Sequence, residues 1–188
     1  MAKISKVQRE AVVVLSSVPS TLPPKILKAF ASAKAVRLNA HAPYSKFQVG
    51  AGLVTSNGTV VTGCNVENAS YGGTVCAERI AIFKAVSEKQ TTFSDIVVVT
   101  DAAEPAYPCA FCLQVMAEFF DPETKIWVAD LNAVRSVHTF KDLLPKPFGP
   151  RQLTDARATA DSSVSVKSLK KSPNSKSAKA PLKKSTAL

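Results

Sequence analysis

Residues 47–63, FQVGAGLVTSNGTVVTG, decide the fold. Two short apolar runs flank Ser56-Asn57-Gly58. An Asn-Gly pair between β-prone runs is the strongest short-range signal for a β-hairpin. The stretch therefore predicts two antiparallel strands joined by a tight turn.

Helix and strand patterns alternate on either side of this hairpin. Apolar residues at helical spacing and flanking prolines predict helices, whereas short apolar runs predict buried strands. The expected helices are residues 4–17, 24–40, 76–88 and 109–120, and the further strands are 95–100, 125–129 and 133–139. This order predicts a three-layer α/β/α domain whose helices cover a mixed sheet of about five strands.

Length and charge suggest three regions. The 188 residues, 46% hydrophobic and 20% charged, suit one globular domain with a full core. From residue 151 onward, nine Lys and Arg face two Asp, so this end holds +7 of the net +10. We expect a helical extension over residues 1–23, a compact domain over 24–150 and a basic, disordered tail over 151–188. Nucleic-acid binding by the tail is not expected, although a basic tail can hold polyanions.

The beginning of the chain and its cysteines suggest a location. The apolar run at residues 11–15 is too short to span a bilayer, and Glu10 interrupts any resemblance to a signal peptide. Four cysteines in one Cys-x-x-Cys pair and two singles do not resemble a secreted disulfide framework. We therefore expect a cytoplasmic protein with no membrane span.

Three cysteines are candidate metal ligands. Cys76, Cys109 and Cys112 each lie at the predicted start of a helix, where the helix dipole favours thiolate. A third cysteine two residues before a glutamate favours metal binding over a Cys-x-x-Cys redox pair. Three protein ligands leave one tetrahedral position open, as in catalytic zinc sites. Cys64 is a possible fourth ligand, but its place after the hairpin favours a buried residue at the end of a strand.

The two histidines are not expected to be ligands. His41 lies in a predicted loop and His138 in a predicted strand, and neither has the spacing of a ligand pair.

Five motifs occur in the order found in a known family. They are Pro43-Tyr44-Ser45-x-Phe47-x-Val49-Gly50, Gly63-Cys64-Asn65-Val66-Glu67-Asn68-Ala69, Cys76-Ala77-Glu78-Arg79, Pro108-Cys109-x-x-Cys112 with Gln114, and Leu143-Leu144-Pro145 leading to Phe148-Gly149-Pro150. Together they resemble the small zinc-dependent cytidine deaminases of pyrimidine salvage across residues 24–150.

The resemblance implies a reaction. One Zn²⁺ per chain, bound by the three cysteines, would supply hydroxide to C4 of cytidine or 2'-deoxycytidine, giving uridine or 2'-deoxyuridine and ammonia. Glu78 would act as the catalytic proton shuttle rather than as a ligand. Arg79 would donate hydrogen bonds to the thiolates and offset their excess negative charge.

The resemblance also assigns substrate contacts. Asn65 and Glu67 would bind the ribose 3'-hydroxyl, and Phe47 would form a wall against the base. Phe148 would enter a neighbouring subunit's pocket, so the resemblance implies a homotetramer with shared active sites. Tyr71 is assigned less directly, because the loop around it differs from the family pattern.

Two departures and two rival functions accompany the resemblance. Ala110 and Leu113 stand where the family commonly has glycine and arginine. One rival is a deaminase of a cytosine-bearing antibiotic or of polynucleotide, and the other is a non-catalytic zinc or nucleic-acid-binding module. Asn65 and Glu67 argue against the first, and Glu78 would have no use in the second.

Overall fold

The computed structural model describes residues 18–104, 106–150 and 152–153. The helix expected over residues 4–17 lies outside this part of the chain, as does the tail expected over residues 151–188 except for residues 152–153. Contacts between residues divide the chain into two units, Met1–Pro150 and Arg151–Leu188. The secondary structure and the site described below belong to the first unit.

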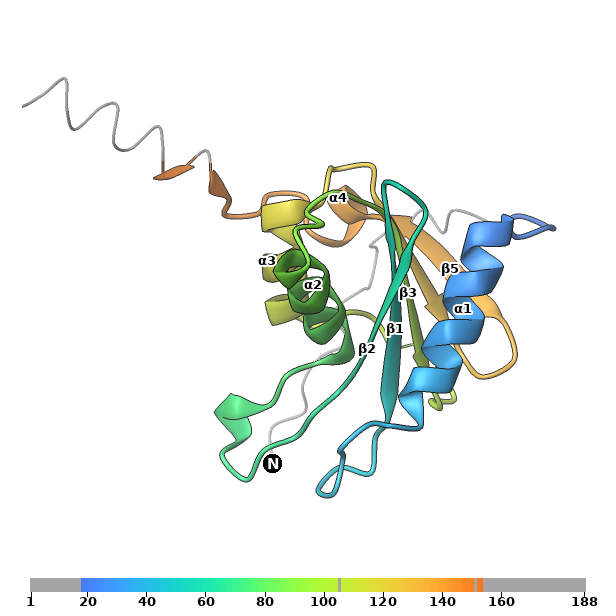
Figure 1. The fold of residues 1–188 in the computed structure, drawn as a ribbon, viewed down its shortest axis with the longest axis vertical. Coiled ribbons are helices and arrows are strands. Elements are labelled where there is room, and N and C mark those ends of the chain that lie inside the picture. The colour runs from blue at the N-terminus through green and yellow to red at the C-terminus, as the bar shows by residue number, and fades with distance from the viewer. Residues whose placement is uncertain (1–17, 105, 151, 154–188) are drawn as a thin grey trace, which may run out of the picture. The chain divides into compact units, whose positions relative to one another are not determined.

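A five-stranded mixed sheet forms the centre of the first unit (Figure 1). Its spatial order is β2-β1-β3-β4-β5, and only β3 and β4 are parallel neighbours. The bounds are β1 Val49–Thr55, β2 Val60–Cys64, β3 Phe93–Thr100, β4 Lys125–Ala129 and β5 Val134–Thr139. The predicted hairpin and mixed sheet are therefore confirmed.

Helices cover both faces of the sheet. In Figure 1, α1 (Pro24–Arg37) lies on one side, while α2 (Ala77–Ser87) and α3 (Ala110–Phe119) lie together on the other. Side chains alternate along each strand, so β3 sends Ile96 and Val98 into the core under α2 and α3, and Val97 and Val99 into the core under α1. The three-layer α/β/α prediction is confirmed.

Two close approaches bring helices onto the sheet. A Cβ atom on Gly52 would lie 2.5 Å from the carbonyl oxygen of Ala29 in α1, and one on Gly63 would lie 2.4 Å from that of Ala77 in α2. Both separations are shorter than any van der Waals contact. Glycine in β2 therefore lets α2 pack with its first turn against the sheet, which fixes the helix that begins beside Cys76.

Some element bounds differ from those expected. The first described helix ends at Arg37 rather than at residue 40, because the amides of Leu38, Asn39 and Ala40 bond three residues back and tighten the chain into a turn. Two short helices, the 3₁₀ helix η1 (Tyr71–Gly73) and α4 (Phe140–Leu143), were not expected. None of the helices in the described residues has both the length and the apolar character of a membrane span.

Candidate active site

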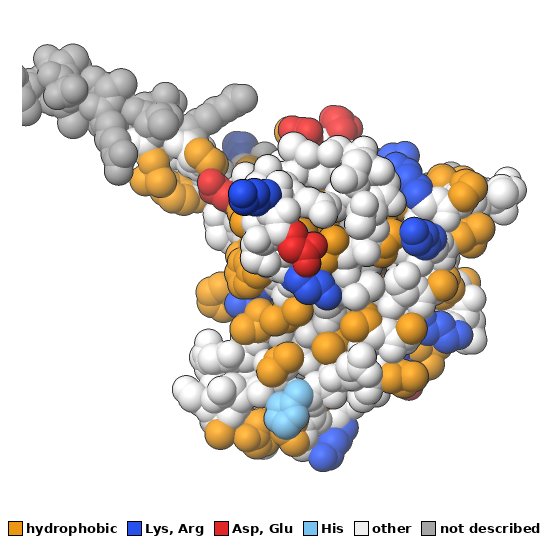
Figure 2. Space-filling view, in the orientation of Figure 1, with side chains coloured by type: hydrophobic (Ala, Val, Ile, Leu, Met, Phe, Trp, Pro, Cys, Tyr) orange, Lys and Arg blue, Asp and Glu red, His pale blue; other side chains and the backbone are white. Residues whose placement is uncertain are grey.

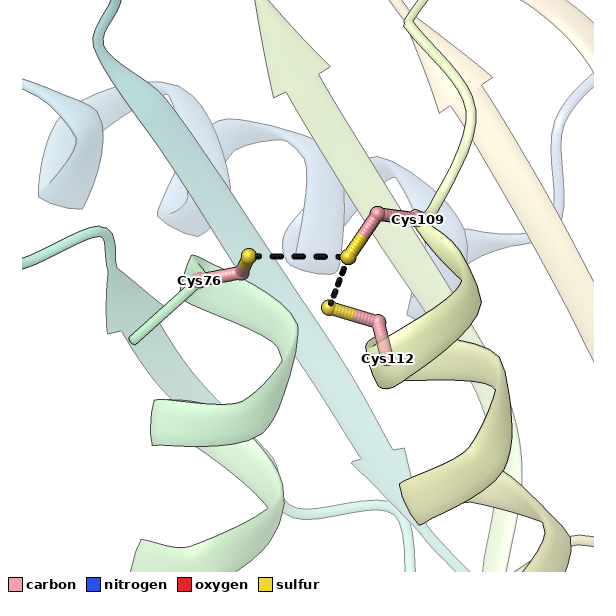
Figure 3. A group of neighbouring side chains, drawn as sticks. All are labelled: Cys76, Cys109 and Cys112. Atoms are coloured by element: carbon pink, nitrogen blue, oxygen red, sulfur yellow. Dashed lines mark hydrogen bonds between the residues drawn. The ribbon is translucent and has the colours of Figure 1, made fainter. Parts of the chain in front are cut away.

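Three cysteine sulfurs meet between α2 and α3 (Figure 3). Cys76 and Cys109 are the N-cap residues of these helices, and Cys112 lies in the first turn of α3. The Sγ atom of Cys109 lies 3.8 Å from that of Cys76 and 3.5 Å from that of Cys112, and all three lie within 4.8 Å of one another. This is the group of potential metal ligands found among the described residues.

The three thiols cannot easily all ionise in the absence of a cation. Hydrogen bonds from Cys112 and Arg79 lower the pKa of Cys76 to about 5. The pKa of Cys112 is raised, because its thiol donates a hydrogen bond to Cys76 and is buried beside negative charge. The first thiolate therefore forms readily and the next is opposed. A soft dication removes this conflict, so the donor set fits Zn²⁺ with one open position.

The other candidate ligands lie elsewhere. Cys64 ends β2, as expected, but it is half-buried rather than buried. His41 is exposed and pairs through its backbone with Val66. His138 is buried in β5, with its ring 5.3 Å from that of Tyr107. None of these three belongs to the sulfur group.

Glu78 is a buried carboxyl group beside the sulfurs. It is the second residue of α2 and only 4% exposed. Burial, with a contribution from the charge of Cys76, raises the pKa of Glu78 to about 7. A carboxyl group with such a pKa can both take and release a proton near neutral pH.

Arg79 follows Glu78 in the first turn of α2 and contacts Cys76. Its Nη2 donates hydrogen bonds to the carbonyl of Thr74, at 2.9 Å, and to Sγ of Cys76, at 3.6 Å. The guanidinium carbon lies 6.0 Å from the centre of the Phe111 ring. The thiolate of Cys76 therefore has a fixed cation next to it.

A cavity of about 230 Å³ opens beside these groups. Its wall includes Cys76, Cys109 and Glu78 together with Phe47, Asn65 and Glu67, which come from the segments on either side of the hairpin. The sequence motifs around residues 47, 65 and 78 thus meet in one place. Ser45, which belongs to the motif around Phe47, also lines the cavity, as do Thr100 and Tyr107, which no motif had marked.

Asn65 and Glu67 hold the loop that precedes β1. The Asn65 side chain accepts a hydrogen bond from the Val49 amide at 2.8 Å and donates one to the Phe47 carbonyl at 2.9 Å. The Glu67 carboxylate accepts from the Tyr44 amide at 2.9 Å and from the Ser45 hydroxyl. These bonds lower the pKa of Glu67, so its carboxylate is charged where the cavity opens.

Two expected substrate contacts lie outside the cavity of their own chain. Tyr71 is 76% exposed and forms a neighbouring hollow with Tyr44, whose ring centre is 6.0 Å away. Phe148 is 58% exposed, and its carbonyl accepts a hydrogen bond from Nε2 of Gln114 at 2.7 Å. The two residues that depart from the family pattern lie in different environments. Leu113 is part of the core under α2 and α3, whereas Ala110 is exposed.

Comparisons with known proteins agree with this geometry. Residues 25–128 match the family described as the cytidine and deoxycytidylate deaminase zinc-binding region. A cytidine deaminase of Halalkalibacterium halodurans is 45% identical over 63% of this chain and 90% of its own. A probable cytidine deaminase of Dictyostelium discoideum is 46% identical over 65% of this chain and 82% of its own.

A solved structure gives the same result. The crystal structure of a cytidine deaminase from Burkholderia pseudomallei superposes with a TM-score of 0.62 and 44% identity, over 65% of this chain and 98% of that one. Family, relatives and sulfur cluster together identify a site for one Zn²⁺. The chain therefore belongs to the zinc-dependent cytidine and deoxycytidylate deaminase family.

Proposed function

We propose that this enzyme hydrolyses cytidine and 2'-deoxycytidine to uridine and 2'-deoxyuridine with release of ammonia. The observation that carries the proposal is the buried Glu78 carboxyl group beside three cysteine sulfurs, in a cavity that also contains Phe47, Asn65 and Glu67. A non-catalytic zinc module would have no use for such a carboxyl group.

The reaction exchanges the 4-amino group of cytosine for the oxygen of one water molecule. Bound zinc supplies a strong nucleophile at neutral pH, because it lowers the pKa of water. Glu78 takes a proton from the attacking water and delivers it to ring N3. It then transfers the second proton of that water, now on the C4 hydroxyl, to the amino group, which leaves as ammonia when the C4–N bond breaks and the C4 carbonyl forms. Burial of the Glu78 carboxyl group favours its protonated form between the two transfers.

Two residues support a nucleoside rather than a nucleotide substrate. Asn65 and Glu67 would face the ribose, where a carboxylate accepts a hydroxyl hydrogen bond and repels a nearby phosphate. Phe47, 39% exposed on the cavity wall, offers a flat apolar surface to the base. The basic tail is not part of this proposal, and the enzyme would act in the cytoplasm.

The active enzyme would be a homotetramer with shared sites. Figure 2 shows hydrophobic side chains spread over one face of the molecule, with most of the charged groups towards its upper and right-hand parts. Large apolar side chains such as Phe83, Phe111 and Phe148 are exposed in the single chain. Aromatic side chains are enriched at protein interfaces relative to the rest of a protein surface. In the assembly, Tyr71 and Phe148 would reach sites of neighbouring subunits.

A substrate panel tests the proposal. Purified enzyme is incubated with cytidine, 2'-deoxycytidine, cytidine monophosphate and a cytosine-containing oligonucleotide, and ammonia release is measured. We expect rapid turnover of both nucleosides and little of the others. Preference for the oligonucleotide would favour a polynucleotide deaminase, and no turnover of any substrate would favour a non-catalytic zinc protein.

A further inference from the structure

One polar side chain interrupts an apolar row where β3 meets the cavity. On the face under α2 and α3, β3 presents Ile96, then Val98, then Thr100. Val98 and Thr100 both line the cavity, and Thr100 pairs with Val49 of β1, which lines it as well. Thr100 therefore belongs to the sheet side of the cavity, in an otherwise aliphatic surface.

The hydroxyl of Thr100 is buried without a partner. The residue is 1% exposed, and its Oγ1 makes no hydrogen bond within the described part of the chain. Other buried threonines there are satisfied: the Thr55 hydroxyl bonds to Asn57 at 2.6 Å, and that of Thr124 to the Phe93 carbonyl at 3.5 Å. A buried unpaired hydroxyl opposes folding, so packing gives no reason for threonine over valine at position 100.

We propose that the Thr100 hydroxyl is a specificity-determining contact that hydrogen-bonds the pyrimidine base of the bound nucleoside. Val98 and Val49 supply an aliphatic surface suited to a planar ring, while the hydroxyl supplies one polar group for its edge. The sugar would contact the Asn65 amide and the Glu67 carboxylate, which lie on the segment after β2. This inference rests on the proposed nucleoside substrate and extends it to a residue that no motif marks.

The hypothesis predicts opposite effects of one substitution on stability and on binding. Thr100→Val keeps the shape of the side chain and removes the hydroxyl. We expect the melting temperature of the nucleoside-free enzyme to rise or stay unchanged, because an unpaired buried group is lost. We expect kcat/KM for cytidine to fall about two- to tenfold, and the affinity for uridine measured by calorimetry to fall similarly, as for one lost neutral hydrogen bond. Thr100→Ser should stay within about twofold of the parent in kcat/KM and affinity.

Thr55→Val is the matched control. It removes a buried hydroxyl that has partners, so it should lower the melting temperature and leave kcat/KM and uridine affinity unchanged. The proposal is overturned if Thr100→Val binds uridine and deaminates cytidine like the parent, or if valine and serine variants lose affinity equally.

The outcome is separable from that of the proposed function. A parent enzyme that binds uridine but does not deaminate cytidine refutes the proposed reaction, and the calorimetry still decides the role of Thr100. A parent that binds no pyrimidine nucleoside overturns both.

Discussion

Cys76 and Cys109 each precede the first residue of a helix, so free backbone N–H groups and the positive end of a helix dipole face their sulfurs. The neighbouring Arg79 adds a full positive charge beside Cys76. At the scale of single residues, the site is therefore prepared for anionic sulfur before any metal binds. The same first turn of α2 contains the buried acid Glu78, so one helical segment positions both the proposed ligand Cys76 and the proposed proton carrier.

Replacement of Cys109 by alanine should abolish zinc binding. The Cys109 sulfur lies within 3.8 Å of both other sulfurs. Its loss leaves only two protein ligands, which is too few for the site. Metal analysis should find close to one zinc per chain in the parent and almost none in Cys109→Ala. Cys64→Ala is the control and should keep its zinc. Full zinc in Cys109→Ala, or loss of zinc in Cys64→Ala, would contradict the ligand assignment.

Replacement of Glu78 by glutamine should separate proton transfer from metal binding. The amide keeps the shape of the side chain and removes its basicity. Zinc content should match that of the parent, while cytidine turnover should fall by about 10²- to 10⁴-fold or more, because one carboxylate serves several transfers. A variant with full zinc and turnover within tenfold of the parent would refute the role of Glu78. Loss of zinc would instead make Glu78 a ligand.

Elements with a strong local signal were predictable from the sequence. The hairpin followed from Asn57-Gly58, and β4 has the bounds that its apolar run indicated. Both site helices begin one residue after the expected position, because Cys76 and Cys109 are caps. By contrast, η1 and α4 are too short to have a helical period, although a capping box of Thr139 and Asp142 starts α4.

The candidate site was predictable from the sequence only for residues whose chemical type and spacing form a motif. Cysteine and glutamate spacing indicated the metal group, but the cavity position of Thr100 depends on how β3 meets β1. The bonds from Asn65 to Phe47 and Val49 likewise join segments that are 16 or more residues apart. Side chains that contact one another only through the folded sheet leave no local pattern in the sequence.

Glycines at two helix–sheet contacts should tolerate no side chain. Gly52→Ala would place a Cβ atom against α1, and Gly63→Ala would place one against α2. Each should lower the free energy of unfolding by about 1–3 kcal/mol or more, as measured by urea denaturation. Gly63→Ala should also reduce bound zinc, because it displaces the helix that begins beside Cys76, whereas Gly52→Ala acts on the opposite face.

Gly72→Ala is the control for both variants. No atom lies within 4 Å of the position of its Cβ, so its stability should stay within about 0.5 kcal/mol of the parent. Equal stability of the Gly52 and Gly72 variants would contradict the close approach of α1. Unchanged zinc in Gly63→Ala would show that α2 can shift without losing its ligand.

At the scale of the whole molecule, the described residues form two hydrophobic cores, one on each face of the sheet, and the cavity beside the three sulfurs. The core residues and the cavity wall all lie between residues 18 and 144. The two expected substrate contacts that do not line that cavity, Tyr71 and Phe148, are both exposed. Neither side chain lines the cavity of its own chain. This is why we propose that each contributes to the site of a neighbouring subunit.

Removal of residues 156–188 should leave the enzyme active. Among the described residues, the two cores and the cavity wall are already complete between residues 18 and 144, and the sequence of residues 156–188 is rich in Ser and Lys and has no aromatic residue. Zinc content and kcat/KM for cytidine should stay within about twofold of the full chain. A large fall in turnover would show that the basic tail contributes to the site. Loss of salt-sensitive retention on immobilised nucleic acid, without loss of turnover, would identify a separate role in binding polyanions.

Phe148 provides the decisive test of shared sites. If its ring completes the site of a neighbouring subunit, Phe148→Ala should lower kcat/KM for cytidine by about tenfold, the loss of one aromatic contact, while zinc content stays that of the parent. Light scattering should give four times the chain mass of 20.0 kDa for the parent.

Coexpression of Phe148→Ala with Glu78→Gln separates action within a chain from action between chains. In mixed oligomers, some sites would combine the intact Glu78 of one chain with the intact Phe148 of another. Turnover should therefore exceed the average of the two variants assayed alone, because such sites contain every residue that the reaction needs. If Phe148 acted within its own chain, no mixed site could be better than those of Phe148→Ala itself, and the activity would equal the average weighted by composition. That result, or a monomeric parent enzyme with full activity, would refute the shared site.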